Sequence, residues 1–314
     1  MVRRENRMDI RKRNRNIFVK KELNITTGDK VFYFLNNIFL GIAIIITLYP
    51  IIFVASASFS SSYAVTTGRV ILWPVEFGLK GYQAVFEHKD IVIGFYNSFI
   101  YTIVGTFINV VFTLLAAFPL SRRELVGNSF ISLLFAFTMW FSGGMIPSYL
   151  LIKDLGWINT RWALIMPGAI GTWNVFITRT YFQSSIPEEI FESASIDGCG
   201  YFRYFTTIAI PLSGAIIAVI TLFYAVGHWN SYFNAFLYIN KKELFPLQIV
   251  LRNILLQHTF DQSMLDVDPE DIDYSLKDLL KYSLIMVSCV PVWVIYPFIQ
   301  KYFVKGIMIG SVKG

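Results

Sequence analysis

The stretch Pro187-Glu-Glu-Ile-Phe-Glu-Ser-Ala-Ser-Ile-Asp-Gly198 is compact, polar and acidic, and Ile210-Pro211 follows it at a short distance. Long apolar segments lie on both sides of it. A hydrophilic helix–turn–helix between two membrane spans is unusual, and it suits a segment that a soluble partner binds. The function of this stretch therefore depends on whether its flanks cross a membrane.

The composition is that of an integral membrane protein. Of the 314 residues, 55% are hydrophobic and only 15% are charged, whereas ordinary soluble domains carry about 25% charged residues. The mean hydropathy is +0.54. The net charge of +6 does not indicate nucleic acid, because the basic residues lie beside apolar spans rather than on one surface. The two cysteines and three histidines have no metal-ligand spacing, so no metal site is predicted.

Six segments are long and apolar enough to cross a membrane, since a spanning helix needs about 20 mostly apolar residues. They are Val31–Ala55, Phe95–Leu120, Phe130–Ile152, Trp162–Phe182, Ile208–Gly227 and Tyr282–Val304. Breaks interrupt the third segment at Gly143, Gly144 and Pro147, and the fourth at Pro167, Gly168 and Gly171. Either a packing kink or a role in lining a pathway accounts for such breaks. We expect an all-α integral membrane fold with six transmembrane helices.

The first span has an alternative interpretation as a cleaved signal peptide, because Ala55-Ser56-Ala57 resembles a cleavage site. The apolar run is longer than a typical signal core, and about thirty polar residues precede it. Both features favour a membrane span.

Lys and Arg residues predict the orientation, because they concentrate on the cytoplasmic side. Ten of the 27 lie in residues 1–30, and six spans that start from a cytoplasmic N-terminus place most of the 27 inside. We therefore expect a basic cytoplasmic segment at 1–30, a six-span domain at 31–304 and a cytoplasmic tail at 305–314. The segment at 183–207 then lies inside, and segments at about 56–94 and 228–281 lie outside.

The second outside segment carries an acidic run. Its members are Asp261, Asp266, Asp268, Glu270, Asp271, Asp273 and Asp278. A solvated loop and a calcium site are both open interpretations, but the spacing is not that of a known calcium-binding loop.

Local signals predict how the cytoplasmic segment folds. Ser185-x-x-Glu188 predicts a capping box, with Pro187 in the first turn. Glutamates at a helix start are favoured by the helix dipole. Gly198 stands where the helix would end in a left-handed residue, and a second short helix at 201–207 would lead into the fifth span. A capped loop helix without any partner is the alternative.

The segment Glu192-Ser-Ala-x-x-x-Gly198, followed by nine residues and Ile208-x-Ile210-Pro211, resembles the EAA motif of ATP-binding-cassette (ABC) importer permeases. The family pattern is Glu-Ala-Ala, three residues, Gly, nine residues and Ile-x-Leu-Pro. The spacing is the same, and Ser193 and Ile210 are mild departures. The resemblance implies a type I importer permease fold whose coupling helix docks in a groove of the ATPase subunit.

The residues that would carry this coupling are Glu188, Glu189, Ile190, Phe191, Glu192, Ser193, Ala194, Asp197, Gly198 and Pro211. Ile190, Phe191 and Ala194 share one helix face by spacing, and we expect this face to contact the groove together with Gly198. Glu192 would either pair with a basic residue of the groove or cap the helix locally.

Further stretches are similar to the carbohydrate-uptake permeases. Met145–Gly156 and Asn159–Pro167 resemble their third and fourth spans, and the ending Gln300–Gly314 resembles the tail of the maltose-type second permease subunit. Pro246-Leu-Gln-Ile-Val-Leu-Arg252 resembles a subgroup of oligosaccharide and polysaccharide importers. The similarity covers about residues 30–314. It implies a subunit that moves an oligosaccharide or polysaccharide fragment from an extracellular solute-binding protein into the cytoplasm.

The resemblance also implies the partners: a second homologous permease subunit, two copies of a cytoplasmic ATPase, the extracellular solute-binding protein, membrane lipid and a carbohydrate substrate. The chain has no phosphate-binding Gly-x-x-x-x-Gly-Lys-Ser/Thr motif. ATP and Mg are therefore expected in the ATPase subunits, and this chain is expected to hold no cofactor and to be no enzyme. The expected location is the bacterial cytoplasmic membrane, with both termini inside. Lys313 either contacts the ATPases or lies in a solvated end.

Sugar sites combine aromatic side chains with amide and hydroxyl partners. The candidates within or beside the spans are Asn97, Asn109, Trp140, Trp173, Asn174, Tyr224, Trp229, Asn230 and Asn234. Polar side chains inside a membrane usually face the helix bundle or a cavity. The cluster at 229–234 is the best candidate, and packing or interfacial anchoring is the alternative for each residue.

Two other classes of function share some of these sequence features. A polytopic membrane glycosyltransferase would need a catalytic group at the membrane edge, but no His, Lys or Ser is spaced to complete one at 266–273. A permease of the same superfamily for a non-sugar solute is compatible with the coupling motif, and the outside segment and the tail disfavour it.

Overall fold

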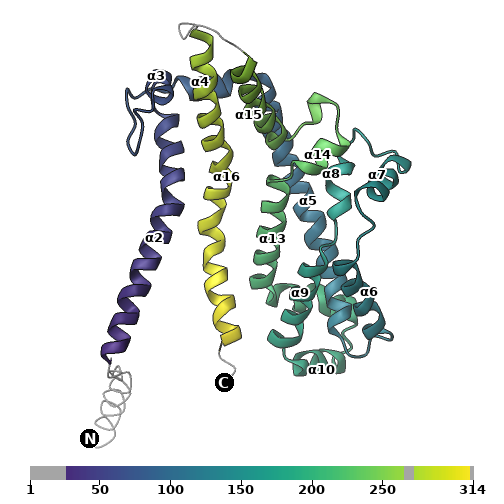
Figure 1. The fold of residues 1–314 in the computed structure, drawn as a ribbon. Helices are drawn as coiled ribbons and strands as arrows, with labels where there is room; N and C mark the ends of the chain where they lie inside the picture. The colour runs from purple at the N-terminus through teal and green to yellow at the C-terminus, as the bar shows by residue number, and fades with distance from the viewer. Residues whose placement is uncertain (1–25, 265–271, 312–314) are drawn as a thin grey trace, which may run out of the picture. The chain divides into compact units, whose positions relative to one another are not determined.

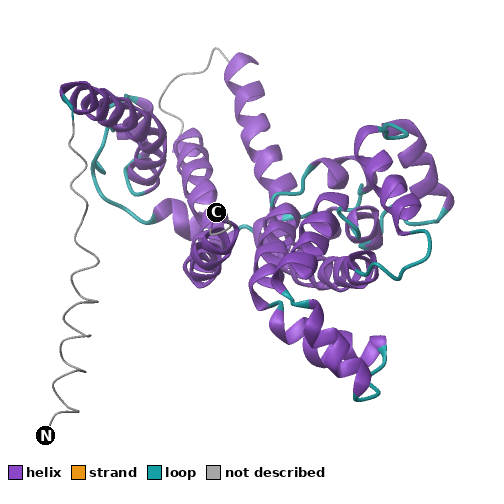
Figure 2. Ribbon diagram, turned by 90° about the horizontal axis from the view of Figure 1, so that it is seen from below, coloured by secondary structure: helices purple, strands orange, loops and turns teal. Residues whose placement is uncertain are grey.

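The computed structural model describes residues 26–264 and 272–311, and throughout these ranges the chain folds only into helices and connecting loops (Figure 2). The basic N-terminal segment up to residue 25 and the last three residues, with Lys313, lie outside the described residues. So do the side chains of the predicted acidic run, which leaves the calcium interpretation untested. The chain forms two units, residues 1–53 and 54–314.

The first unit contains most of helix α2 (Thr27–Ser58). Thr26 starts the helix, because its hydroxyl accepts a hydrogen bond from the backbone N–H of Asp29 at 3.3 Å, and its own N–H donates to the Asp29 carboxylate at 2.9 Å. The helix is long and apolar enough to cross a membrane. A helix that is apolar on all sides suits a lipid environment. Ala55-Ser56-Ala57 lies inside this helix.

The second unit is built around α5 (Lys89–Ser121), against which α9 (Thr172–Ser185), α13 (Gly214–Trp229) and α15 (Leu247–Met264) pack (Figure 1). Helix α16 (Ile272–Ser311) packs on α13 and on α4 (Lys80–Glu87). Gly94 and Gly105 of α5 face α15 and α13. A Cβ on Gly105 would overlap His228, and a Cβ on Gly94 would crowd Val250 and Leu247. The other helices are α3 (Ser62–Thr66), α6 (Asn128–Trp140), α7 (Met145–Asp154), α8 (Trp162–Ile165), α10 (Glu188–Ile196), α11 (Tyr201–Tyr204), α12 (Ile210–Leu212) and α14 (Phe233–Tyr238).

The predicted spans are single, bent or broken helices. Within the described residues, three helices are long and apolar enough to cross a membrane: α2, α5 and the part of α16 at Leu279–Pro297. The third predicted span is the pair α6–α7, bent by 112°, and the fifth is α11–α12 followed by α13, bent by 81°. The fourth is divided into α8, the 3₁₀ turn η1 (Met166–Gly168) and α9. Counting each bent pair as one span gives five.

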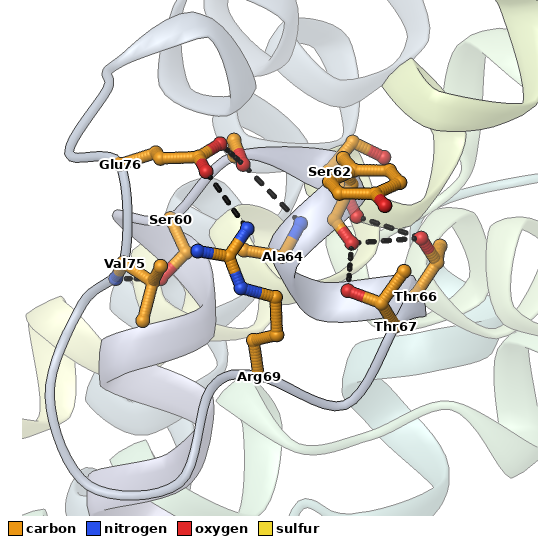
Figure 3. Close-up of polar contacts among 10 residues, drawn as sticks. Ser60, Ser62, Ala64, Thr66, Thr67, Arg69, Val75 and Glu76 are labelled. Atoms are coloured by element: carbon orange, nitrogen blue, oxygen red, sulfur yellow. Dashed lines mark hydrogen bonds and ion pairs between the residues drawn. The ribbon is translucent and has the colours of Figure 1, made fainter.

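The loop between α2 and α4 is held in one shape by polar contacts (Figure 3). The backbone N–H of Val75 donates to the hydroxyl of Ser60 at 3.0 Å, and the Glu76 carboxylate accepts hydrogen bonds from Ser61 at 2.5 Å and Arg69 at 2.9 Å. Glu76 has a positive φ of 57°, which is uncommon for a residue other than glycine. The polar contacts therefore fix a backbone conformation that the sequence alone does not favour.

Candidate coupling segment and polar interior of the spans

The acidic segment forms helix α10, and its first turn differs from the prediction. Ser185 is the last residue of α9, and Pro187 occupies the N-cap position without any side-chain hydrogen bond to the helix. The capping-box prediction was wrong because α9 runs on to Ser185, which leaves its side chain no extended backbone position from which to cap α10. Glu188 and Glu189 do lie in the first turn, as expected.

The end of α10 follows the prediction. Gly198 has a φ of +76°, and its N–H donates to the carbonyl of Ser195 at 3.0 Å. The N–H of Cys199 donates to the carbonyl of Ala194 at 2.9 Å. These two bonds form a Schellman motif, which requires a left-handed residue at Gly198. Nothing within this chain lies within 4 Å of a Cβ placed on Gly198, so the surface beside it is open.

The face predicted to contact a groove is turned partly inward. Ala194 is buried, and the Phe191 ring packs against Tyr201 and Tyr204, with centroid distances of 5.3 and 5.0 Å. Ala194 and part of Phe191 thus pack against the chain's own core, and contact between Phe191 and an ATPase groove stays a prediction. Helix spacing identified their shared face correctly, but the apolar partner was α11 of the same chain.

The outward surface of the segment is formed by other residues. Exposed positions are Glu188, Glu189, Ile190, Glu192, Ser193, Ile196, Asp197, Gly198 and, further on, Pro211. Ile196 is 86% exposed. In the sequence, the signal that could have identified Ile196 is an apolar residue directly before Asp197, at the end of a polar and acidic stretch. The candidate contact surface is therefore acidic, with Ile190 and Ile196 as its apolar members.

Arg122 connects this segment to α5 and was not identified from the sequence. Its guanidinium carbon lies 4.4 Å from the ring centroid of Phe191 and 5.0 Å from those of Phe118 and Tyr204. One guanidinium nitrogen lies 3.6 Å from the Glu188 carboxylate. A polar pocket of about 220 Å³ lies beside Arg122, between the end of α5 and the start of α10.

Side chains of α5 and α13 form hydrogen bonds with the backbone groups that the break in the fourth span leaves without helical partners. The side-chain amide of Asn109 donates to the carbonyl of Gly168 at 2.5 Å, and its oxygen lies 3.1 Å from a ring nitrogen of His228. The Tyr224 hydroxyl accepts a hydrogen bond from the backbone N–H of Gly171 at 3.0 Å. Buried backbone groups without partners are costly, so these side chains stabilise the irregular segment between α8 and α9.

This arrangement places Asn109 and Tyr224 in structural roles. Both are buried, with every described polar atom of Asn109 directed at another part of the chain. Asn97 is also buried, and its amide donates to the carbonyls of Glu243 and Phe245 at 2.7 and 3.1 Å. Asn97, Asn109 and Tyr224 thus hold a loop and the break in the fourth span in place. This agrees with the alternative that these side chains serve packing rather than sugar binding.

Trp229, the centre of the favoured cluster, is packed between helices in this structure. Its side chain is buried against the rings of Phe95 and Phe99, at centroid distances of 5.5 and 5.4 Å, and its indole N–H donates to the carbonyl of Ser288 at 3.0 Å. These contacts agree with the packing alternative, and contact between Trp229 and a sugar stays a prediction. The sequence does not show which side of α13 meets α5 and α16.

The remaining candidates are dispersed. Trp140 and Trp173 are 84% and 63% exposed, on α6 and α9. Asn230 is exposed and donates to the carbonyl of Val226 at 3.0 Å, which ends α13. Asn174 and Asn234 are half-buried. The structure thus brings together Asn109 and Tyr224, and it places the Asn174 amide near Tyr224 beside Gly171. The two exposed tryptophans lie on the surface of this chain.

A helical chain with several apolar helices, a broken span held by buried polar side chains and a polar helix between spans has the architecture of a polytopic membrane protein. No family model matches the chain. It is 39% identical to Protein LplC of Bacillus subtilis (strain 168) over 289 residues, covering 92% of this chain and 97% of that protein. It is 40% identical to the polygalacturonan/rhamnogalacturonan transport system permease protein YtcP of the same organism over 279 residues, covering 88% and 96%.

A solved structure gives the same result. A chain of a bacterial ABC transporter involved in the import of the acidic polysaccharide alginate superposes with a TM-score of 0.80 at 33% identity, covering 88% of this chain and 98% of that chain. This chain therefore belongs to the permease subunits of ABC importers. It is a multi-pass membrane protein, and the resemblance in the sequence is confirmed.

Proposed function

We propose that this subunit imports an acidic oligosaccharide or polysaccharide fragment, delivered by an extracellular solute-binding protein, and that α10 is its coupling helix. The complex would contain a second homologous permease and two copies of a cytoplasmic ATPase, which bind ATP and Mg. The six-span topology with both termini in the cytoplasm belongs to the same proposal. The acidic nature of the substrate is supported by the alginate importer and by YtcP, both of which are similar to nearly the whole chain.

The observation that carries the coupling assignment is the open surface at the end of α10. Gly198 must be left-handed to complete the Schellman motif, yet nothing in this chain occupies the space beside it. Asp and Asn tolerate this backbone region better than other side chains. Gly198→Asp should therefore fold, with the backbone strain that a side chain brings at a positive φ. A loss of coupling larger than that of an equally strained variant elsewhere would come from a second polypeptide that approaches this surface.

The test uses the assembled transporter in vesicles with its binding protein. Gly198→Asp should lower the sugar transported per ATP hydrolysed by about fivefold or more. Gly68→Asp is the matched control, because Gly68 has a φ of +69° and equally open surroundings in the loop between α2 and α4. Unchanged coupling in Gly198→Asp would refute the assignment of α10.

The substrate class has a separate test. The cognate binding protein should bind oligogalacturonates or alginate fragments and not neutral oligosaccharides of the same length. Vesicles that contain the complete transporter should then accumulate only the acidic fragments. Equal uptake of neutral oligosaccharides would remove the acidic substrate from the proposal and leave the importer unaffected.

A further inference from the structure

Arg122 stands at the junction between α5 and the coupling segment. It is the residue immediately after α5, and only 11% of its side chain is exposed. The three rings that surround its guanidinium come from three helices: Phe118 from α5, Phe191 from α10 and Tyr204 from α11. One buried cation thus makes contact with both helices of the cytoplasmic segment.

The rings, more than the carboxylate, hold this cation. The Glu188 carboxylate is half-exposed at 53% and lies 3.6 Å away, and exposed ion pairs contribute little. Cation–π contacts gain strength when water is excluded, and the planar guanidinium suits stacking on aromatic faces better than an ammonium does. Among the described residues, no hydrogen-bond partner reaches the buried Nε atom of Arg122, which leaves the ring faces as the main contacts of the guanidinium.

The rings also contact one another. Phe191 meets Tyr204 edge to face at 5.0 Å, and Phe118 stacks on Tyr204 at 6.1 Å and packs on Phe205 at 4.9 Å. Packed aromatic groups of this kind resist sliding, because displacement opens voids. A displacement of α10 would therefore carry Phe191, the guanidinium and the end of α5 together.

Helix α5 leads from this junction to the break in the fourth span. Leu114, one turn before Phe118 on α5, belongs to the same hydrophobic core as Phe118. Closer to the start of α5, Thr113 contacts Tyr224 and Asn109 contacts Gly168. We infer that Arg122 is the positioning residue that transmits movement of α10 to α5, and through α5 to the polar contacts around the broken span. This inference rests on the proposed coupling role of α10.

The test compares two neighbouring arginines in the assembled transporter. Arg122→Gln should keep the ATPases bound, judged by co-purification, while the sugar transported per ATP hydrolysed falls about fivefold to tenfold. Arg123→Gln is the matched control, because Arg123 is exposed and forms no ion pair within the part of the chain that is described. Normal coupling in an assembled Arg122→Gln transporter would overturn the inference.

A further variant separates the aromatic contacts from the charge. Arg122→Lys keeps the positive charge but not the planar group that stacks on the rings, so it should give an intermediate loss of the coupling ratio. Normal coupling in Arg122→Lys would show that the charge alone is sufficient, and the aromatic contacts would not be the transmitting element.

A variant that does not depend on Arg122 covers the case in which Arg122→Gln fails to assemble. Phe191→Leu keeps an apolar side chain on the core and removes the ring face that the cation contacts. It should assemble and lose coupling to the same degree as expected for Arg122→Gln, and normal coupling would overturn the inference. The remaining outcome is that Gly198→Asp uncouples the transporter while Arg122→Gln and Phe191→Leu couple normally. In that case the proposed function stands and only the role of Arg122 fails.

Discussion

The hydroxyl oxygen of Tyr224 on α13 lies 2.7 Å from the hydroxyl oxygen of Thr113 on α5. The same Tyr224 hydroxyl accepts the backbone N–H of Gly171. One side chain thus joins the two central helices to the break in the fourth span. Because Gly171 precedes α9, this contact also sets where α9 begins.

Replacing Tyr224 with phenylalanine should destabilise the protein. The ring volume is retained, but Gly171 and Thr113 lose a partner in a buried setting, which costs about 1–3 kcal/mol. The change should appear as a lower midpoint of thermal unfolding in detergent. Tyr96→Phe is the control, because Tyr96 on α5 is 64% exposed. Equal midpoints for Tyr224→Phe and the unmodified protein would show that water or another group replaces the contact.

The close approach of α5 and α13 at Gly105 leads to a second prediction. A Cβ on Gly105 would overlap the imidazole of His228, which lies 3.1 Å from the Asn109 oxygen. Gly105→Ala must therefore move His228 and disturb the Asn109 contacts, and overpacking of this kind costs about 1–3 kcal/mol. We expect a lower yield of folded protein by size-exclusion chromatography. Gly227→Ala on α13, where nothing lies within 4 Å, should give a normal yield.

Trp229 provides a third prediction, on the role of the cluster at 229–234. Trp229→Ala leaves a cavity between α5, α13 and α16, and such truncations cost about 3–5 kcal/mol. Thermal unfolding should shift to a clearly lower temperature, and fewer transporters should assemble. Trp173→Ala, which removes a side chain that is 63% exposed, should leave the unfolding temperature unchanged. Reduced uptake at unchanged stability in Trp229→Ala would identify Trp229 as a substrate contact.

Local signals in the sequence predicted local structure well. The left-handed Gly198 and the acidic first turn of α10 follow from preferences of adjacent residues, and the long apolar runs predicted α2, α5 and α16. The capping box failed because a neighbouring helix was longer than its residues suggest. Contacts between distant residues were not predictable: Asn109 and His228 are 119 positions apart. Such contacts between distant residues decide which face of α10 or α13 meets the core. The packing of Phe191, Trp229 and Arg122 was therefore visible only in the structure.

The loop between α2 and α4 should respond to pH through Glu76. Hydrogen bonds from Ser61 and then Arg69 stabilise its carboxylate and lower the pKa of Glu76 below its ordinary value of 4.5. Because the pKa is lowered in the folded state, the stabilisation is present above the pKa of the unfolded chain and is lost as the pH falls through the folded pKa. The contacts with Ser61 and Arg69 should therefore weaken only in acid.

Amide hydrogen exchange in residues 60–76 can measure this loss, after correction for the chemical exchange rate at each pH. The N–H groups of Ala64 and Val75 donate to the hydroxyls of Ser61 and Ser60, and their protection should decrease as the pH falls from neutrality through the lowered pKa of Glu76. In Glu76→Gln the side chain carries no charge at any pH, so protection should be lower at neutral pH and nearly independent of pH. A pH response in Glu76→Gln equal to that of the unmodified protein would assign the effect to another group.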